Sequence, residues 1–218
     1  MIGGNGVKGS TAIEIAVLLT LLSLLPAILV TVTSFTRIVI VLSFVRRSLS
    51  INELPPNPVI TGLALFLTMF VMAPVAERVH AKAYVPYREG RIQAAEAGET
   101  AWTELRGFLV ANTRPSEIAF FSELAHIEPG TPEAETPPAR VVVPAFVLSE
   151  LKTAFQMGFL LFLPFLVIDL VVSSVLLSMG MFMLPPVMVS TPFKILIFVL
   201  VDGWHLVCNS LVTSFTTT

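Results

Sequence analysis

The sequence predicts an all-helical, membrane-associated fold built of helical hairpins, and two observations support this. Of the 218 residues, 55% are apolar, which is well above the share in soluble domains. The 13 basic and 15 acidic residues are also unevenly placed, because 17 of these 28 fall between Glu77 and Arg140. Apolar sequence interrupted by one charged segment is typical of a membrane protein with one solvent-exposed insertion.

Four apolar blocks mark the expected helices, at residues 12–45, 59–75, 155–177 and 187–207. The last three suit a helix of roughly 20 residues that crosses a hydrocarbon layer about 30 Å thick. The first is too long for one straight crossing, and it carries Pro26 and the polar run TVTSFTR at 31–37. We expect it either to break near this run or, as we favour in part, to be buried there against protein, where hydroxyls make good helix contacts.

These blocks divide the chain into three parts. Residues 12–76 hold the N-terminal apolar helices, 77–143 the charged insertion, and 144–212 a C-terminal helical hairpin with a methionine-rich loop at 179–186. The arginines at 46 and 47 predict that the short connector after them, at 52–58, is cytoplasmic, so that the insertion is extracytoplasmic. No cleavage motif precedes the first apolar run, so no signal peptide is predicted.

The insertion is expected to contain two amphipathic helices and a solvated loop. TAWTELRGFLVAN at 100–112 has helical spacing of its large apolar residues. PSEIAFFSELAHI at 115–127 has the pattern of a capped helix, with Ser116 as the candidate N-cap. EPGTPEAETPPA at 128–139 is rich in proline and glutamate and is expected to be a mobile loop.

Several classes of function are disfavoured by composition. The net charge of −2 gives no electrostatic reason to expect nucleic-acid binding. Cys208 is alone, so it forms no disulfide within the chain. The three histidines, His80, His126 and His205, lack the spacing of metal ligands, and no phosphate-binding glycine loop is present. We therefore expect no cofactor and no metal.

The candidate functional residues are the charges embedded in apolar sequence. Each would be unfavourable facing lipid, so each should face protein or water. They are Arg37, Glu150, Lys152, Asp169, Lys194 and Asp202. Glu150 and Lys152 lie two positions apart on a helix expected to open at Pro144, so they should point to different sides rather than pair.

Asp169 and Lys194 lie on either side of the methionine-rich loop, so an antiparallel hairpin brings them to similar heights. Lys194 has two possible partners: Asp169 of its own hairpin, or Glu150 of a neighbouring copy. Such charges either hold subunits around a polar path or form a buried ion pair that fixes packing. A catalytic pair of Asp169 and Asp202 is disfavoured, because neither has the glycine-flanked pattern expected of an intramembrane aspartyl protease. We therefore predict that the chain is not an enzyme.

The loop between the third and fourth blocks reads SMGMFMLPPVMVS at 178–190. Its apolar centre consists of Met179, Met181, Phe182 and Met183. Gly180 permits a tight bend, and the two prolines at 185 and 186 keep the next helix from starting early. Because methionine is flexible, a ring of such loops could close and then part around a passing chain; alternatively, the methionines fill gaps at a helix junction.

The chain resembles the FliP family of flagellar type III export-apparatus proteins, which are called SctR in virulence secretion systems. The resemblance extends from about residue 18 to 204. It is carried by SFTRIVIVLSFVRRSL at 34–49, PPNPVITGLALFLTMFVMAPV at 55–75, VPAFVLSELKTAFQMGFLLFLPFLVIDLVVSSVLLSMGMFMLPPV at 143–187 and TPFKILIFVLVDGW at 191–204. The motif SFTRI looks more flagellar than virulence-type.

This resemblance implies a pore-forming subunit of the export gate in the bacterial inner membrane, at the flagellar basal body. Several copies would assemble with FliQ-like and FliR-like subunits into a ring raised largely above the lipid, beside FlhB-like and FlhA-like proteins. Unfolded flagellar proteins would pass through the ring.

The resemblance also implies roles for single residues. Met179, Met181 and Met183 would form a gasket that seals the closed pore, with Phe182 where relatives commonly have methionine. Glu150 and Lys194 would pair between subunits. From the residues alone, the alternative function is a small-ion channel or transporter whose path is lined by Asp169, Lys194 and Asp202.

Overall fold

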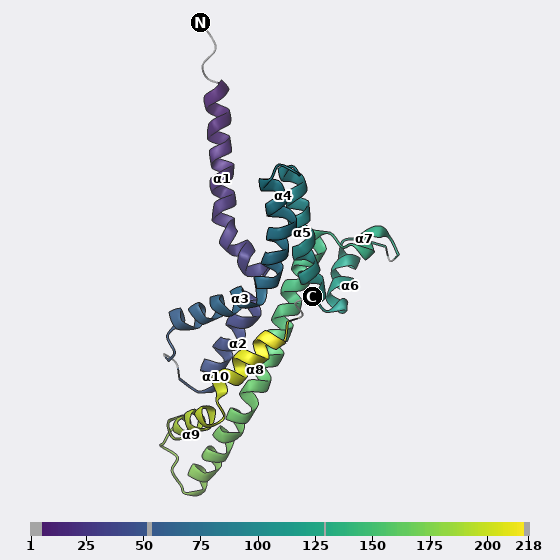
Figure 1. The fold of residues 1–218 in the computed structure, drawn as a ribbon. Coiled ribbons are helices and arrows are strands. Elements are labelled where there is room, and N and C mark those ends of the chain that lie inside the picture. The colour runs from purple at the N-terminus through teal and green to yellow at the C-terminus, as the bar shows by residue number, and fades with distance from the viewer. Residues whose placement is uncertain (1–5, 52–53, 129, 216–218) are drawn as a thin grey trace.

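The computed structural model describes residues 6–51, 54–128 and 130–215, and this part of the chain is helical without strands, as predicted (Figure 1). Residues 52 and 53 of the predicted connector and residue 129 of the predicted loop lie outside the described residues. The elements are α1 (Gly6–Thr31), α2 (Phe35–Ser48), α3 (Asn57–Val79), the π-helix η1 (His80–Tyr84), α4 (Val85–Arg88), α5 (Ala94–Ala111), α6 (Pro115–Leu124), α7 (Pro132–Glu135), α8 (Ala139–Ser178), α9 (Pro186–Leu200) and α10 (Gly203–Thr213).

The longest helix, α8, organises the fold. Its 40 residues make a rod about 60 Å long, beginning at Ala139 rather than at Pro144, the expected start. The third apolar block is only its C-terminal half. Figure 1 shows α2 lying along α8, α9 folding back at its C-terminal end, and the insertion helices grouped around its N-terminal end.

The core lies mainly between α2 and α8. Ile38, Val41, Leu42 and Val45 are buried at the helical spacing that lines one face of α2. They belong to one cluster with Val142, Phe146 and Ala154 of α8. Gly158 of α8 permits close packing, because a Cβ there would lie 2.5 Å from the ring of Phe44. This packing fixes the apolar face of α2 against α8.

The long first block breaks between α1 and α2, which was one of the two expected outcomes. The hydroxyls of Thr31, Thr33 and Thr36 donate hydrogen bonds to backbone carbonyls in the last turn of α1, at 2.7–3.0 Å. These hydroxyls satisfy acceptors that a helix end leaves unpaired. The second expectation also holds for α2, which is buried against protein, whereas none of the residues in Glu14–Thr31 whose burial is described is buried.

The fourth block is not the single helix expected over 187–207. It bends by 63° between α9 and α10, where Asp202 adopts the left-handed conformation with φ 50°. Aromatic packing explains the bend: the ring of Phe198 meets Trp204 at 5.3 Å and Phe165 at 6.3 Å. A Cβ at Gly203 would lie 2.2 Å from the Phe198 ring, so the ring occupies the space beside this glycine.

In the insertion, α5 and α6 confirm the two amphipathic helices. The predicted cap of α6 is wrong, because the helix begins at Pro115 with Arg114 as its N-cap, and Ser116 lies in the first turn. Proline suits that first position because it has no N–H to satisfy. The acidic loop contains the short helix α7, at whose N-terminus the Thr131 hydroxyl accepts from the Ala134 N–H.

By length and composition, three helical stretches of the described chain could cross a membrane: Glu14–Thr31, Asn57–Arg88 and Pro132–Ser178. The bent pair α9–α10 is a fourth if it counts as one span.

Candidate functional site

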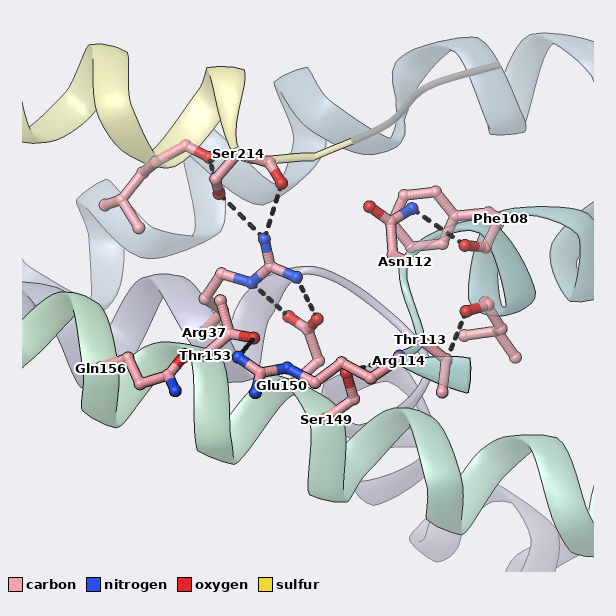
Figure 2. Close-up of polar contacts among 12 residues, drawn as sticks. Arg37, Phe108, Asn112, Thr113, Arg114, Ser149, Glu150, Thr153, Gln156 and Ser214 are labelled. Carbon is pink, nitrogen blue, oxygen red and sulfur yellow. Dashed lines mark hydrogen bonds and ion pairs between the residues drawn. The ribbon is translucent and has the colours of Figure 1, made fainter. Parts of the chain in front are cut away.

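A buried ion pair joins α2, α8 and the end of α10 (Figure 2). Arg37 donates from Nε to Glu150 Oε2 at 2.9 Å and from Nη2 to the other carboxylate oxygen. Its Nη1 donates to both the backbone carbonyl and the hydroxyl of Ser214, each at 2.9 Å. The guanidinium also stacks on Phe215, with Cζ 3.8 Å from the ring centroid. Both charged side chains are almost inaccessible to solvent.

A second polar network joins α8, α9 and the segment after α2. Lys194 Nζ lies 2.6 Å from Asp169 Oδ2 and 2.7 Å from Ser50 Oγ. The Ser190 hydroxyl donates to the other carboxylate oxygen of Asp169 at 2.6 Å. Lys194 and Ser190 are buried, and the Asp169 side chain is 26% exposed. The network spans the two helices that carry the methionine-rich loop.

Of the two partners considered for Lys194, the one it contacts within the chain is Asp169. Glu150 is instead bound to Arg37. A pairing of Glu150 with Lys194 of another copy stays a prediction. The expectation that Glu150 and Lys152 point to different sides is confirmed, because Lys152 Nζ lies 2.7 Å from Glu117 Oε1 of α6.

Asp202 stands apart from both networks. It is exposed at the α9–α10 bend, and its carboxylate has no hydrogen bond or ion pair within the described ranges. Both carboxylate oxygens of Asp169 are occupied by Lys194 and Ser190. Across the described residues, the two aspartates therefore form no hydrogen-bonded pair that could share a proton.

Sequence reasoning missed the contacts between α6 and α8. The Arg114 N–H donates to Ser149 Oγ at 3.1 Å, and its guanidinium reaches Thr153 at 3.2 Å and Gln156 (Figure 2). The hydrogen bond from Lys152 lowers the pKa of Glu117 from its ordinary value. One feature of the sequence could have indicated these contacts. Arg114 lies directly before Pro115, so a basic residue stands at the start of an amphipathic helix.

A third charged cluster lies within the insertion. Glu104 of α5 accepts from Lys82 of η1 at 2.6 Å and from Arg78 of α3 at 3.2 Å. The hydrogen bond from Lys82 is the main cause that lowers the pKa of Glu104. This cluster ties α5 to the end of the long α3–η1 helix. No group of three potential metal ligands is found in the portion of the chain that is described.

The methionine-rich loop forms the turn that the sequence predicts. Gly180 takes φ 74°, and α9 begins at Pro186. The loop side chains project from the chain: Met183 is 96% exposed, Phe182 76%, Met179 67% and Met181 37%. The loop therefore lies outside the core of the single chain.

Comparison with known proteins matches the FliP family over residues 18–211. The flagellar biosynthetic protein FliP of Bacillus subtilis is 51% identical over 94% of this chain and 93% of its own length. The protein of the same name from Pectobacterium carotovorum is 50% identical, covering 97% of this chain and 81% of its own length. That of Aquifex aeolicus is 45% identical, covering 94% and 86%. The chain belongs to the FliP family.

Proposed function

We propose that this chain is a pore-forming core subunit of the flagellar type III export gate. Membership in the FliP family makes it a component of flagellar protein export rather than an enzyme. Several copies, together with FliQ-like and FliR-like subunits and beside FlhB-like and FlhA-like proteins, conduct unfolded flagellar proteins across the inner membrane. The observation that carries the pore role is the exposed methionine-rich loop on a fixed base.

The loop is suited to sealing a path. Its four apolar side chains are uncovered in one chain, and burying one such side chain is worth about 1.5–3 kcal/mol. Copies that bring their loops together would gain this energy. Methionine adapts its shape readily, so a ring of these loops can close tightly and still open. Phe182 is stiffer and adds area to the seal.

The base of the loop is held by the Lys194 network. Asp169 lies on α8 and Lys194 on α9, so their ion pair ties together the two helices that carry the loop. An exposed tip on a fixed base suits a gate that opens without disturbing the subunit. The same pairing disfavours the small-ion transporter, because Asp169 and Lys194 neutralise each other and Asp202 lies apart from them.

The large apolar surface supports assembly in or beside a membrane. Exposed residues on α3 and α8 include Phe66, Met69, Phe70, Phe159 and Leu160. Clusters of exposed apolar side chains of this size are covered by lipid or by other subunits in a stable protein. We propose that both cover it, with neighbouring copies on one side and lipid on the other.

The test is photocrosslinking of a substrate stalled during export. The chain, carrying a photoreactive amino acid at Met183, replaces the FliP relative in a flagellated cell that secretes a flagellar protein fused to a stably folded domain. Met69 is the matched control, because it is 68% exposed but lies on α3. Crosslinking at 183 and not at 69 is expected. Active export with no crosslink at 183 would contradict the pore role of the loop.

A further inference from the structure

We infer that neighbouring copies of this chain contact each other through Arg47 of one copy and Asp202 of the next. The inference rests on the proposed function, because it requires that copies assemble. It starts from two opposite charges that have no hydrogen-bonded or ion-pair partner among the described residues of the chain.

Arg47 lies in the last turn of α2 and is exposed. Its guanidinium makes no hydrogen bond or ion pair in the described part of the chain, whereas the adjacent Arg46 bonds Asn57 and the Pro55 carbonyl. Arg47 also lies at the rim of a groove of about 260 Å³ between α2 and α8. The groove is otherwise lined by Val39, Ile40, Ser43, Phe44 and Phe155. It is thus an apolar groove with one cation at its rim.

Asp202 has the complementary character. It lies at the 63° bend between α9 and α10, where the chain turns a sharp corner. The two residues before it, Leu200 and Val201, are 74% and 52% exposed. The corner is therefore an apolar projection with one carboxylate at its tip. A carboxylate so placed is unfavourable against lipid and favourable against a cation.

The two features lie at similar heights along α8. Phe44, one turn before Arg47, contacts Phe155, with ring centroids 5.5 Å apart. Phe198, one turn before Asp202, contacts Phe165 at 6.3 Å. The chain then continues through α10, whose end brings Ser214 to Arg37, which binds Glu150. Phe155 and Phe165 are ten residues apart on α8, so Arg47 and Asp202 lie within about three helical turns of each other in height.

Similar height matters because a ring places copies side by side. In a ring whose axis runs along α8, rotation brings similar heights of neighbouring copies together. The groove and the corner are different surfaces, so their contact is head-to-tail. Such a contact leaves one groove free at one end of the assembly and one corner free at the other, and it closes only when a ring is complete. A two-fold contact would instead stop at the dimer.

The test is disulfide crosslinking of the full chain in isolated membranes. Cys208→Ser removes the native thiol, and Arg47→Cys and Asp202→Cys are introduced together. Mild oxidation is expected to give a ladder of dimer, trimer and higher species. Either cysteine alone is expected to give monomer, and a mixture of the two single variants to give dimer only. Arg46→Cys with Asp202→Cys is the matched control, since Arg46 faces its own chain's Asn57.

Charge dependence gives a second readout. Asp202→Asn keeps a residue that tolerates φ 50°, and Arg47→Gln keeps the side-chain length. Each is expected to weaken self-association in detergent about three- to fivefold, as an accessible ion pair does. The double variant should be no weaker than either single variant, because both remove the same contact. Additive losses, or no loss, would overturn the pairing.

The outcomes separate the inference from the proposed function. Oligomers that form normally, by native mass measurement, without a 47–202 crosslink would overturn the inference and leave assembly standing. A chain that stays monomeric in membranes alone and with FliQ-like and FliR-like partners would overturn both. A ladder that includes the Arg46 control would show contact without specificity and would also contradict the pairing.

Discussion

Arg37 and Glu150 are 113 positions apart in the sequence and form a two-point hydrogen-bonded ion pair with side-chain exposures of 4% and 0%. The pair joins α2 to α8, and Ser214 brings the C-terminal helix to the same guanidinium. Since the charges are enclosed by protein, each depends on the other for its solvation.

Replacing Arg37 by alanine is therefore expected to lower the free energy of unfolding by about 3–5 kcal/mol, because it leaves the Glu150 carboxylate buried and unpaired. Reversible unfolding in a detergent and SDS mixture measures this. Arg140→Ala is the matched control: the Arg140–Glu133 pair is 64% exposed on both sides, so its loss should cost less than about 1 kcal/mol. Equal effects of the two variants would contradict the structural role of Arg37.

Gly158→Ala is expected to destabilise the chain by about 1–3 kcal/mol, because the new Cβ would lie 2.5 Å from the Phe44 ring and force α2 away from α8. Gly107→Ala is the control in α5, where no atom lies within 4 Å of the new Cβ. There the substitution should stabilise by about 0.5–1 kcal/mol through its helix propensity. Thermal melts of both variants test the opposite signs. A stabilising Gly158→Ala would mean that the α2–α8 contact is looser than described.

Lys194→Met is expected to destabilise the hairpin by about 2–3 kcal/mol, because it leaves Asp169 and Ser50 without the ammonium. Adding Asp169→Leu should recover at least half of the loss, since the remaining pair of side chains is apolar. Hydrogen exchange should show faster exchange at residues 179–190 in the single variant than in the double variant. Unchanged exchange in the single variant would show that the pair does not hold the loop.

The charged contacts of the insertion predict a dependence on pH. The lowered pKa of Glu117 means that its contact with Lys152 contributes stability above the unfolded pKa near 4.5 and loses it as the pH falls through the lower folded pKa. The melting temperature should therefore decline below about pH 4.5. Glu117→Gln should be less stable than wild type at neutral pH and should converge with it near pH 3. Two parallel curves would contradict this contribution.

The helix positions could be predicted largely from hydropathy. The blocks at 59–75 and 155–177 fall within α3 and α8, because long apolar runs leave few alternatives, even though each block carries a proline, Pro74 and Pro164. The bend in the fourth block could not be predicted from hydropathy, since it depends on the Phe198 ring filling the space beside Gly203. Periodicity along one segment carries no information on such contacts between side chains.

The sequence predicted which residues belong to the candidate site better than it predicted which of them pair. Charges in apolar sequence identified Arg37, Glu150, Asp169 and Lys194, because burying a charge demands a partner. The choice of partner depends on which helices lie side by side. That arrangement follows from the packing of α2 on α8, which no local pattern encodes. Ser214 was missed for the same reason: a serine near the chain end has no sequence feature that points to Arg37.

The central claim is that the methionine-rich loop seals a protein-conducting path. It is tested most directly by ion leakage through membranes of cells that express the chain with its FliQ-like and FliR-like partners. The variant with Met179, Met181 and Met183 all changed to alanine is compared with wild type and with Met69→Ala. Leakage in the triple variant alone is the predicted result. An assembled triple variant that stays as tight as wild type would contradict the claim.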